Sequence, residues 1–143
     1  MTPVVVLDIN VVLDLWHFQD PRTQHLDQVL EARALRVMTC EALNLELEDV
    51  LSRNAFAATR PTVLQKWRGL SELRPLHQRA PWHCRDQDDQ KLLDLAVSTS
   101  ACALLTRDKA LLALAARAAQ CELQIVVPEH FDFSSMRPTS LPH

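Results

Sequence analysis

Two short apolar runs constrain the fold of this 143-residue chain more than any other feature. Residues 4–7 are three valines and a leucine, and residues 101–105 form a second apolar run far along the sequence. Apolar runs of this length without alternation are typical of strands that are buried on both faces. Such strands belong to parallel sheets with helices on either side, so the two runs predict an α/β fold.

Segments with helical periodicity lie between the predicted strands. We expect further strands at 35–40 and 124–127, and helices at 11–16, 21–33, 41–53, 61–70, 88–100 and 108–119. The stretch from Pro75 to Cys84 shows no clear pattern. This alternation predicts a three-layer α/β/α sandwich, with a central, mainly parallel sheet of four to five strands. Residues 1–131 would form the domain, and 132–143 a loose C-terminal tail.

Composition and charge exclude several classes of protein. A net charge of −3 argues against a protein that coats nucleic acid by charge alone, but not against an enzyme that acts on nucleic acid through metal ions. No segment has the pattern of a signal peptide or a membrane span. The four cysteines form no C-x-x-C pair, and Cys84 with His77 and His83 fits no common zinc pattern. We therefore expect a cytoplasmic protein with reduced thiols.

Two aspartates follow the apolar runs. Asp8 comes directly after the first run, and Asp108 comes three residues after the second. The carboxyl ends of parallel strands meet at one edge of the sheet, where ligand sites of open α/β folds lie. We expect the two carboxylates to lie close together there.

Helical phase selects two more acidic residues. At roughly 100° per residue, Asp89 falls on the apolar face of helix 88–100, whereas Asp88 points away from it. On helix 41–53, Glu46 lies at the edge of the apolar face, and Glu48 and Asp49 lie further round. Glu46 and Asp89 are therefore the acids of these helices that can join Asp8 and Asp108.

Carboxylates gathered at one edge repel one another by about 4 kcal/mol per pair at ~4 Å and an effective dielectric near 20. A bound cation or a proton relieves that repulsion. The simpler alternative is that Asp89 and Asp108 only cap their helices, because aspartate is favoured at helix N-termini. Convergence of all four acids would favour a site.

The motifs around these acids resemble those of PIN-domain proteins. They span residues 6–12, 46–51, 84–96 and 104–112, in the family's order and spacing. Residues 125–131 are similar to the last strand and turn of the toxins of toxin–antitoxin pairs, the VapC-like ribonucleases. The resemblance covers residues 3–131.

The resemblance implies a metal-dependent ribonuclease and assigns roles to named residues. Asp8, Glu46, Asp89 and Asp108 would form the acidic cluster that holds Mg²⁺ or Mn²⁺. Asn10 would orient Asp8, and Thr106 would form a hydrogen bond within the site. The chain departs from the family at Ile9, where a small hydroxyl residue is common, and at Arg107, where glycine is common. The basic residues next to the acids are candidate phosphate contacts: Arg85, Arg107 and Lys109.

The resemblance also implies partners: an RNA substrate, a second copy in a homodimer, and a small antitoxin that reaches the acids with an Arg or Lys. Helices 21–33 and 61–70 carry apolar side chains that would form either an interface or the core: Leu26, Val29, Leu30, Val63, Leu64 and Trp67. The main alternative is a catalytically silent PIN-like module that binds RNA or protein. A phosphatase of the haloacid dehalogenase type would need a second aspartate where Asn10 stands.

Overall fold

A computed structural model describes residues 2–133 of the protein. Five parallel strands form one sheet in the order β3-β2-β1-β4-β5. The strands are β1 (Val4–Leu7), β2 (Arg36–Thr39), β3 (Ser71–Leu73), β4 (Ala103–Leu105) and β5 (Gln124–Val126). The two apolar runs lie side by side as β1 and β4 in the middle of the sheet, where all their side chains except Val4 and Cys102 are buried. The predicted fold class is confirmed.

β3 is the strand that the sequence pattern did not indicate. It consists of Ser71, Glu72 and Leu73, which form no apolar run, and Leu73 is 60% exposed. The strand is an edge of the sheet and pairs only with β2. An ion pair of 2.7 Å between Glu72 and Arg36 of β2 reinforces that pairing. The place of β3 in the sheet therefore depends on its pairing with β2 more than on the residues of β3 themselves.

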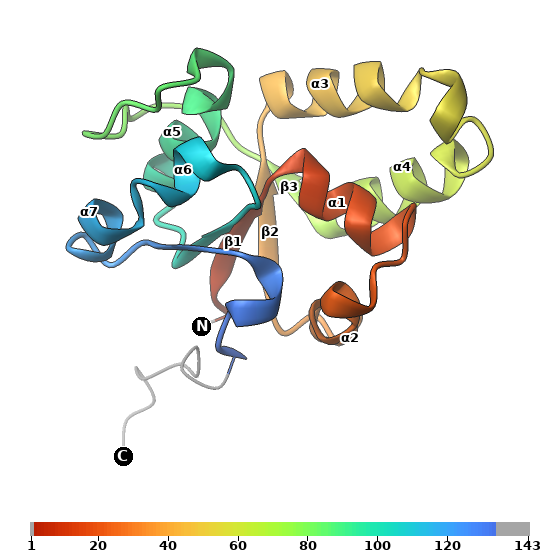
Figure 1. Ribbon diagram of the computed structural model, residues 1–143, viewed down its shortest axis with the longest axis horizontal. Coiled ribbons are helices and arrows are strands. Elements are labelled where there is room, and N and C mark those ends of the chain that lie inside the picture. The colour runs from red at the N-terminus through yellow and green to blue at the C-terminus, as the bar shows by residue number, and fades with distance from the viewer. Residues whose placement is uncertain (1, 134–143) are drawn as a thin grey trace.

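Helices cover both faces of the sheet (Figure 1). On one side lie α1 (Ile9–Trp16), α2 (Gln24–Glu31) and α4 (Arg60–Leu70), and on the other lie α5 (Gln90–Ser98), α6 (Lys109–Leu112) and α7 (Ala115–Ala119). Helix α3 (Glu41–Leu51) begins at the edge at which the strands end and runs from there over the side of α1 and α4. These three layers place the carboxyl ends of β1 and β4 between α3, α5 and α6.

Three of the predicted helices are divided in the structure, and the others differ from the prediction by at most two residues at an end. The predicted helix 21–33 begins with a separate 3-10 helix, Pro21–Thr23, which Asp20 caps by accepting from the Arg22 N–H at 2.9 Å. The predicted helix 88–100 likewise begins with a 3-10 helix, Gln87–Asp89. The predicted helix 108–119 is divided into α6 and α7. The tighter turn of Gln87–Asp89 changes which acidic side chains meet at the site.

The apolar residues that we weighed as an interface belong largely to the core. Leu26, Leu30, Val63 and Trp67 are each at most 2% exposed, and Val29 and Leu64 pack against the same core. The structure therefore agrees with the alternative in which these side chains pack inside the domain. The large apolar side chains that are exposed lie elsewhere: Phe18, Leu45, Leu73 and Leu76.

The start of β1 and the 3-10 helix Pro128–His130 lie on the side away from α3 (Figure 1). Of the predicted tail, only Asp132 and Phe133 belong to the described residues, and the rest lies outside them. The Phe133 ring packs edge-on against Phe131 and His25. No helix within residues 2–133 is long and apolar enough to span a membrane.

Candidate active site

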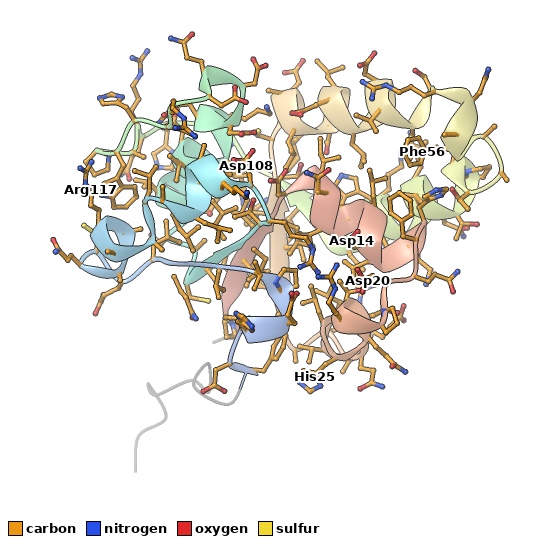
Figure 2. The ribbon with its side chains drawn as sticks, viewed as in Figure 1. Asp14, Asp20, His25, Phe56, Asp108 and Arg117 are labelled. Carbon is orange, nitrogen blue, oxygen red and sulfur yellow. The ribbon has the colours of Figure 1, made fainter. Side chains whose placement is uncertain are left out.

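Asp8 and Asp108 meet at the carboxyl edge of the sheet, as predicted. Leu7 of β1 stands opposite Leu105 of β4, and the Asp8 N–H donates to the Leu105 carbonyl at 3.0 Å. Both aspartates therefore leave neighbouring strands at the same level. Figure 2 shows Asp108 near the middle of the molecule, whereas Phe56 and Arg117 lie at opposite sides. Asp8 is only 7% exposed, so its carboxylate is almost enclosed by protein.

Thr106 connects these two aspartates. Its buried hydroxyl donates to Asp8 Oδ2 at 2.7 Å and accepts from the Asp108 N–H at 3.0 Å. Asp108 in turn caps α6, because its Oδ1 accepts from the Ala110 N–H at 2.7 Å. The supporting hydrogen bond predicted for Thr106 is thus present. Asp108 is both a helix cap and a member of the site.

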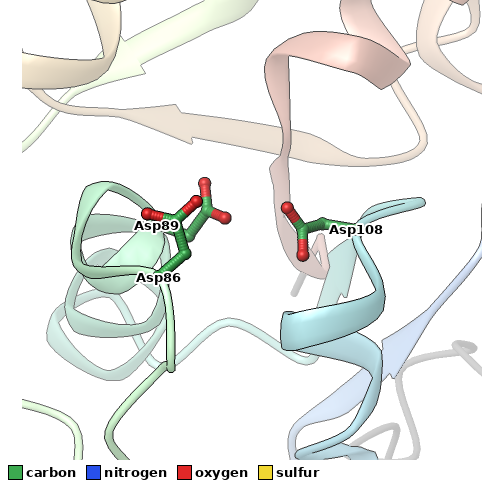
Figure 3. A group of neighbouring side chains, drawn as sticks. All are labelled: Asp86, Asp89 and Asp108. Carbon is green, nitrogen blue, oxygen red and sulfur yellow. The ribbon is translucent and has the colours of Figure 1, made fainter.

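Asp89 approaches Asp108 from the opposite side, together with Asp86. Figure 3 shows both side chains directed from the turn before α5 toward Asp108. One carboxylate oxygen from each of the three aspartates lies within 4.8 Å of the others. Asp89 occupies the N-cap position of α5 without a side-chain capping bond, and its Oδ2 is buried without a hydrogen-bond partner. Capping therefore does not explain Asp89.

The enclosed carboxyl groups hold protons more strongly than usual. Burial, a hydrogen bond with Asp108 and the charges of Asp108, Asp8 and Asp86 raise the pKa of Asp89 to about 7. Burial also raises the pKa of Asp8, and the charges of Asp108 and Glu46 add to the effect, while the Thr106 hydrogen bond opposes it. Burial is the largest cause of both pKa shifts, and the charges of the neighbouring carboxylates add to it.

Glu46 reaches the same edge from α3 but has a partner of its own. Its Oε1 lies 2.6 Å from Nζ of Lys91 on α5, and its charge is close enough to affect Asp8. The Lys91 ammonium also donates to the backbone carbonyl of Asp88. Glu48 and Asp49 are exposed, as helical phase predicted. Glu46 therefore belongs to the acidic edge as one half of an ion pair.

Asn10 does not support Asp8 in this structure. It is exposed, and among the described residues its side chain forms no hydrogen bond with Asp8. The bond to Asp8 comes from Thr106 instead. Asn10 lies in the first turn of α1, whose buried side chains include its neighbours Ile9 and Val11. Helical phase turns Asn10 away from that buried side.

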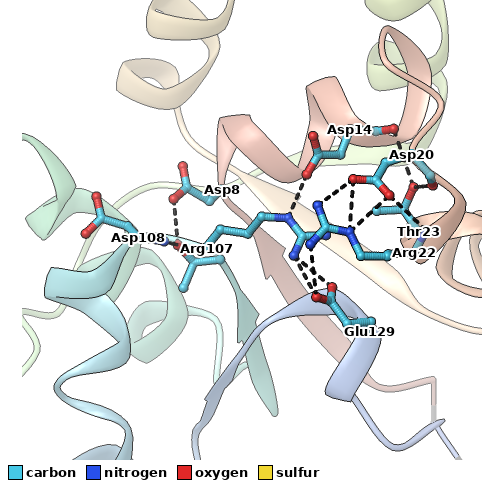
Figure 4. Close-up of polar contacts among 9 residues, drawn as sticks. Asp8, Asp14, Asp20, Arg22, Thr23, Arg107, Asp108 and Glu129 are labelled. Atoms are coloured by element: carbon cyan, nitrogen blue, oxygen red, sulfur yellow. Dashed lines mark hydrogen bonds and ion pairs between the residues drawn. The ribbon is translucent and has the colours of Figure 1, made fainter.

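The three basic residues next to the acids have different surroundings. Arg85 and Lys109 are exposed. Arg107 points away from Asp108, toward α1 and the turn after β5 (Figure 4). Its Nε lies 2.7 Å from Asp14 and its Nη1 lies 2.8 Å from Glu129, and its side chain is 19% exposed. The expectation that Arg107 meets a phosphate is therefore not supported, since ion pairs within the protein engage it.

Two residues of the site, Asp86 and Lys91, were missing from the sequence prediction. Asp86 lies in the motif at 84–96, but the predicted helix began at Asp88, so Asp86 had no assigned direction. Its side chain caps the 3-10 helix by accepting from the Asp88 N–H at 3.0 Å, which turns it toward Asp89. An aspartate three residues before Asp89 was the available signal. The sequence contains no comparable signal for Lys91, because its partner Glu46 lies on a different helix.

The residues suit a divalent cation of the hard type. Mg²⁺ and Mn²⁺ prefer oxygen ligands, and here at least three carboxylates present oxygens to one another. The buried Oδ2 of Asp89 has no hydrogen-bond partner among the described residues, so it fits the role of a ligand to such an ion. Asp86, Asp89 and Asp108 could hold the ion, with Asp8 beside them.

A parallel α/β/α sandwich with a carboxylate cluster at its C-terminal edge has the acidic groups where open α/β folds bind their ligands. The family model for the PIN domain matches residues 4–110 of the 143-residue chain. The chain therefore belongs to the PIN-domain family, whose members are generally nucleases and so hydrolases. The match includes all four acidic residues selected from the sequence, together with Asp86 and Lys91. No curated protein matches the chain significantly.

Proposed function

We propose that this PIN-domain protein is a ribonuclease that hydrolyses RNA phosphodiester bonds with Mg²⁺ or Mn²⁺. The observation that carries the proposal is the group of Asp86, Asp89 and Asp108, whose oxygens lie within 4.8 Å of one another. Asp8 and Glu46 complete the acidic edge. No other described group of three or more acids, histidines or cysteines is gathered in this way.

Each carboxylate has a defined task in this proposal. A bound divalent cation would supply an activated water and stabilise the oxygen that leaves the phosphorus. Asp89 would give up its proton and offer the buried Oδ2 to the ion. Thr106 would hold one oxygen of Asp8, and the N-cap bond would hold one oxygen of Asp108, so that both carboxylates stay oriented. No protein nucleophile is needed.

The RNA backbone would be bound by cations near the acids rather than by the net charge of the protein. Arg85 precedes Asp86, and Lys109 follows Asp108, and both are exposed at this edge. Each can neutralise a phosphate beside the one that reacts. The tryptophans are buried, with exposures of 4% for Trp16, 2% for Trp67 and 8% for Trp82, so base stacking is left to other residues.

Cleavage of a labelled single-stranded RNA tests the proposal. Wild type should cut it with Mn²⁺ or Mg²⁺, and a chelator should stop the reaction. Asp108→Asn should reduce the rate at least 100-fold while it keeps the helix cap, because asparagine also caps. Asp49→Asn is the matched control, since Asp49 is exposed on α3. RNA binding without cleavage would favour the silent module, and cleavage unaffected by chelator would contradict the metal.

We further propose that the ribonuclease acts as a toxin restrained by a small antitoxin, and that it forms a homodimer. The exposed Leu45, Leu73 and Leu76 line one groove with Arg74 and Pro75, which offers an apolar surface for a partner. Expression of wild type in a bacterial host should slow growth, and Asp8→Ala should not. Equal growth would favour an RNA-processing role. A monomeric mass in sedimentation at micromolar concentration would contradict the dimer.

A further inference from the structure

We infer that the Lys91 ammonium acts as a built-in cation on the Glu46 side of the site, so that the site takes one divalent ion rather than two. The inference rests on the proposed function, because it concerns how the acidic edge binds its metal. Lys91 is a positioning residue: it acts on the metal through Glu46.

The contacts of Lys91 fix its ammonium group at this edge. It lies 2.6 Å from Glu46 Oε1 and also donates to the Asp88 carbonyl, so two bonds from different elements hold it. The Lys91 side chain is 17% exposed, less than the other lysine seen in an ion pair, Lys66, at 39%. Lysine usually extends its ammonium into water. The Lys91 ammonium group instead lies next to the Glu46 carboxylate, where it is mostly shielded from water.

The acids at the edge are divided between two kinds of surroundings. Within residues 2–133, none of Asp8, Asp86, Asp89 and Asp108 forms an ion pair with a Lys or Arg. Glu46 does form one, and it is outside the group whose oxygens lie within 4.8 Å. An ion pair within the protein thus compensates the charge of Glu46, whereas none compensates the charges of Asp86, Asp89 and Asp108.

This division determines where a metal ion can enter. At the aspartates, an ion would meet uncompensated carboxylates and a buried oxygen with no partner. At Glu46, a second ion would have to displace the ammonium, and the two cations would repel each other across a few ångströms. Without Lys91, neither Glu46 nor Asp8 would have an ion-pair partner, although Asp8 would keep its hydrogen bond from Thr106. Removal of the ammonium should therefore open a second metal position.

A purely structural role for Lys91 makes a different prediction. If the Lys91–Glu46 pair only joins α5 to α3, its loss should lower the melting temperature slightly and leave metal binding unchanged. The number of bound ions distinguishes the two roles, because an ion pair that only joins α5 to α3 would not change that number.

The test is a titration of the whole protein with Mn²⁺ alone, in which bound ions per chain are counted by calorimetry and by the paramagnetic signal of free Mn²⁺. Wild type should bind one ion. Lys91→Gln and Lys91→Ala should each bind a second, and Lys91→Arg, which keeps the charge, should bind one. Lys66→Gln is the matched control: it removes a lysine paired with Glu31 at 3.5 Å, away from the site, and should bind one ion.

Each result has a defined meaning. Two ions on wild type, or one ion on both Lys91→Gln and Lys91→Ala, would overturn the inference and leave the metal-dependent nuclease intact. No bound ion on any variant would instead defeat the proposed function, and the inference with it. Gln and Ala both favour helices, so neither variant should disturb α5 at this position. Circular dichroism verifies that each variant is folded.

Discussion

The Thr106 hydroxyl donates to Asp8 Oδ2 at 2.7 Å and accepts from the Asp108 N–H at 3.0 Å, so one buried side chain orients the acidic ends of two strands. Asp8 and Thr106 are 98 residues apart in sequence. Only the pairing of β1 with β4 brings them together.

Replacement of Thr106 by valine should weaken metal binding. Valine has nearly the same shape but leaves Asp8 without its donor and the Asp108 N–H without its acceptor. Loss of a bond to a residue that holds a metal ligand typically costs 10- to 100-fold in metal affinity, and an unsatisfied buried group costs about 1–3 kcal/mol of stability. Mn²⁺ titration and thermal melting measure the two effects. Thr106→Ser should retain both, and an unaffected Thr106→Val would argue against this role.

Metal-free protein should lose stability as the pH rises from about 4 to 7. Folded Asp89 keeps its proton up to a pKa of about 7, whereas an unfolded aspartate releases it near 4. Between these values the folded state binds more protons, so the free energy of unfolding falls as the pH rises. With allowance for solvent screening, we expect a loss of about 1–2 kcal/mol.

Melting curves in chelator at pH 4.5 and 7.5 measure this loss. Asp89→Asn should reduce the dependence on pH, and the remainder would reflect Asp8, whose pKa is raised in the same direction. Saturating Mn²⁺ should remove the loss, because the ion replaces the proton. An identical pH dependence in wild type and Asp89→Asn would contradict the assignment.

Divalent metal should raise the melting temperature through the aspartates. An ion present at 100 times its Kd stabilises the folded state by about 2.7 kcal/mol, or roughly 10 °C for a domain of this size. Asp108→Asn should lose most of this rise and keep the melting temperature measured in chelator, because the cap on α6 remains. Asp49→Asn should respond like wild type. A full metal response in Asp108→Asn would place the ion elsewhere.

Arg107 and Lys109 should differ in what their loss affects. Arg107→Gln leaves Asp14 without its guanidinium partner and Glu129 with only the longer contact to Arg22 at 3.6 Å, and should lower stability by about 1–3 kcal/mol with little change in metal binding. Lys109→Gln should leave stability unchanged and weaken RNA binding. The RNA affinity of this variant should also fall less steeply with salt concentration than that of wild type. Melting and RNA titration at two salt concentrations compare them. A larger loss of RNA affinity in Arg107→Gln, at unchanged stability, would reverse the assignment.

Much of the fold could be predicted because the central strands are encoded locally. The apolar runs that form β1 and β4 are unmistakable, and the acids that follow them fix the edge of the site. Helical phase also separated Asp89, which is half-buried, from Asp88, which is exposed. β3 could not be predicted, since Ser71, Glu72 and Leu73 form a strand only because β2 lies beside them.

The missing parts of the site depend on contacts between distant segments. Lys91 joins the site only because α5 packs beside α3, which the sequence of either helix does not state. Arg107 was assigned to phosphate from its place beside Asp108, but Asp14 and Glu129 engage its side chain from other elements. The sequence pattern selected Asp89 and Asp108 but missed Asp86, the third member of their group. The partners of long basic side chains required the tertiary structure.

Anomalous diffraction from crystals grown with Mn²⁺ is the most direct test of the central claim, that the aspartates at the carboxyl edge of the sheet hold the catalytic metal. We predict a manganese peak within about 2.5 Å of carboxylate oxygens of Asp89 and Asp108, and its loss in Asp108→Asn. A peak bound to other residues, or no peak at millimolar Mn²⁺ where RNA is still cleaved, would contradict the account.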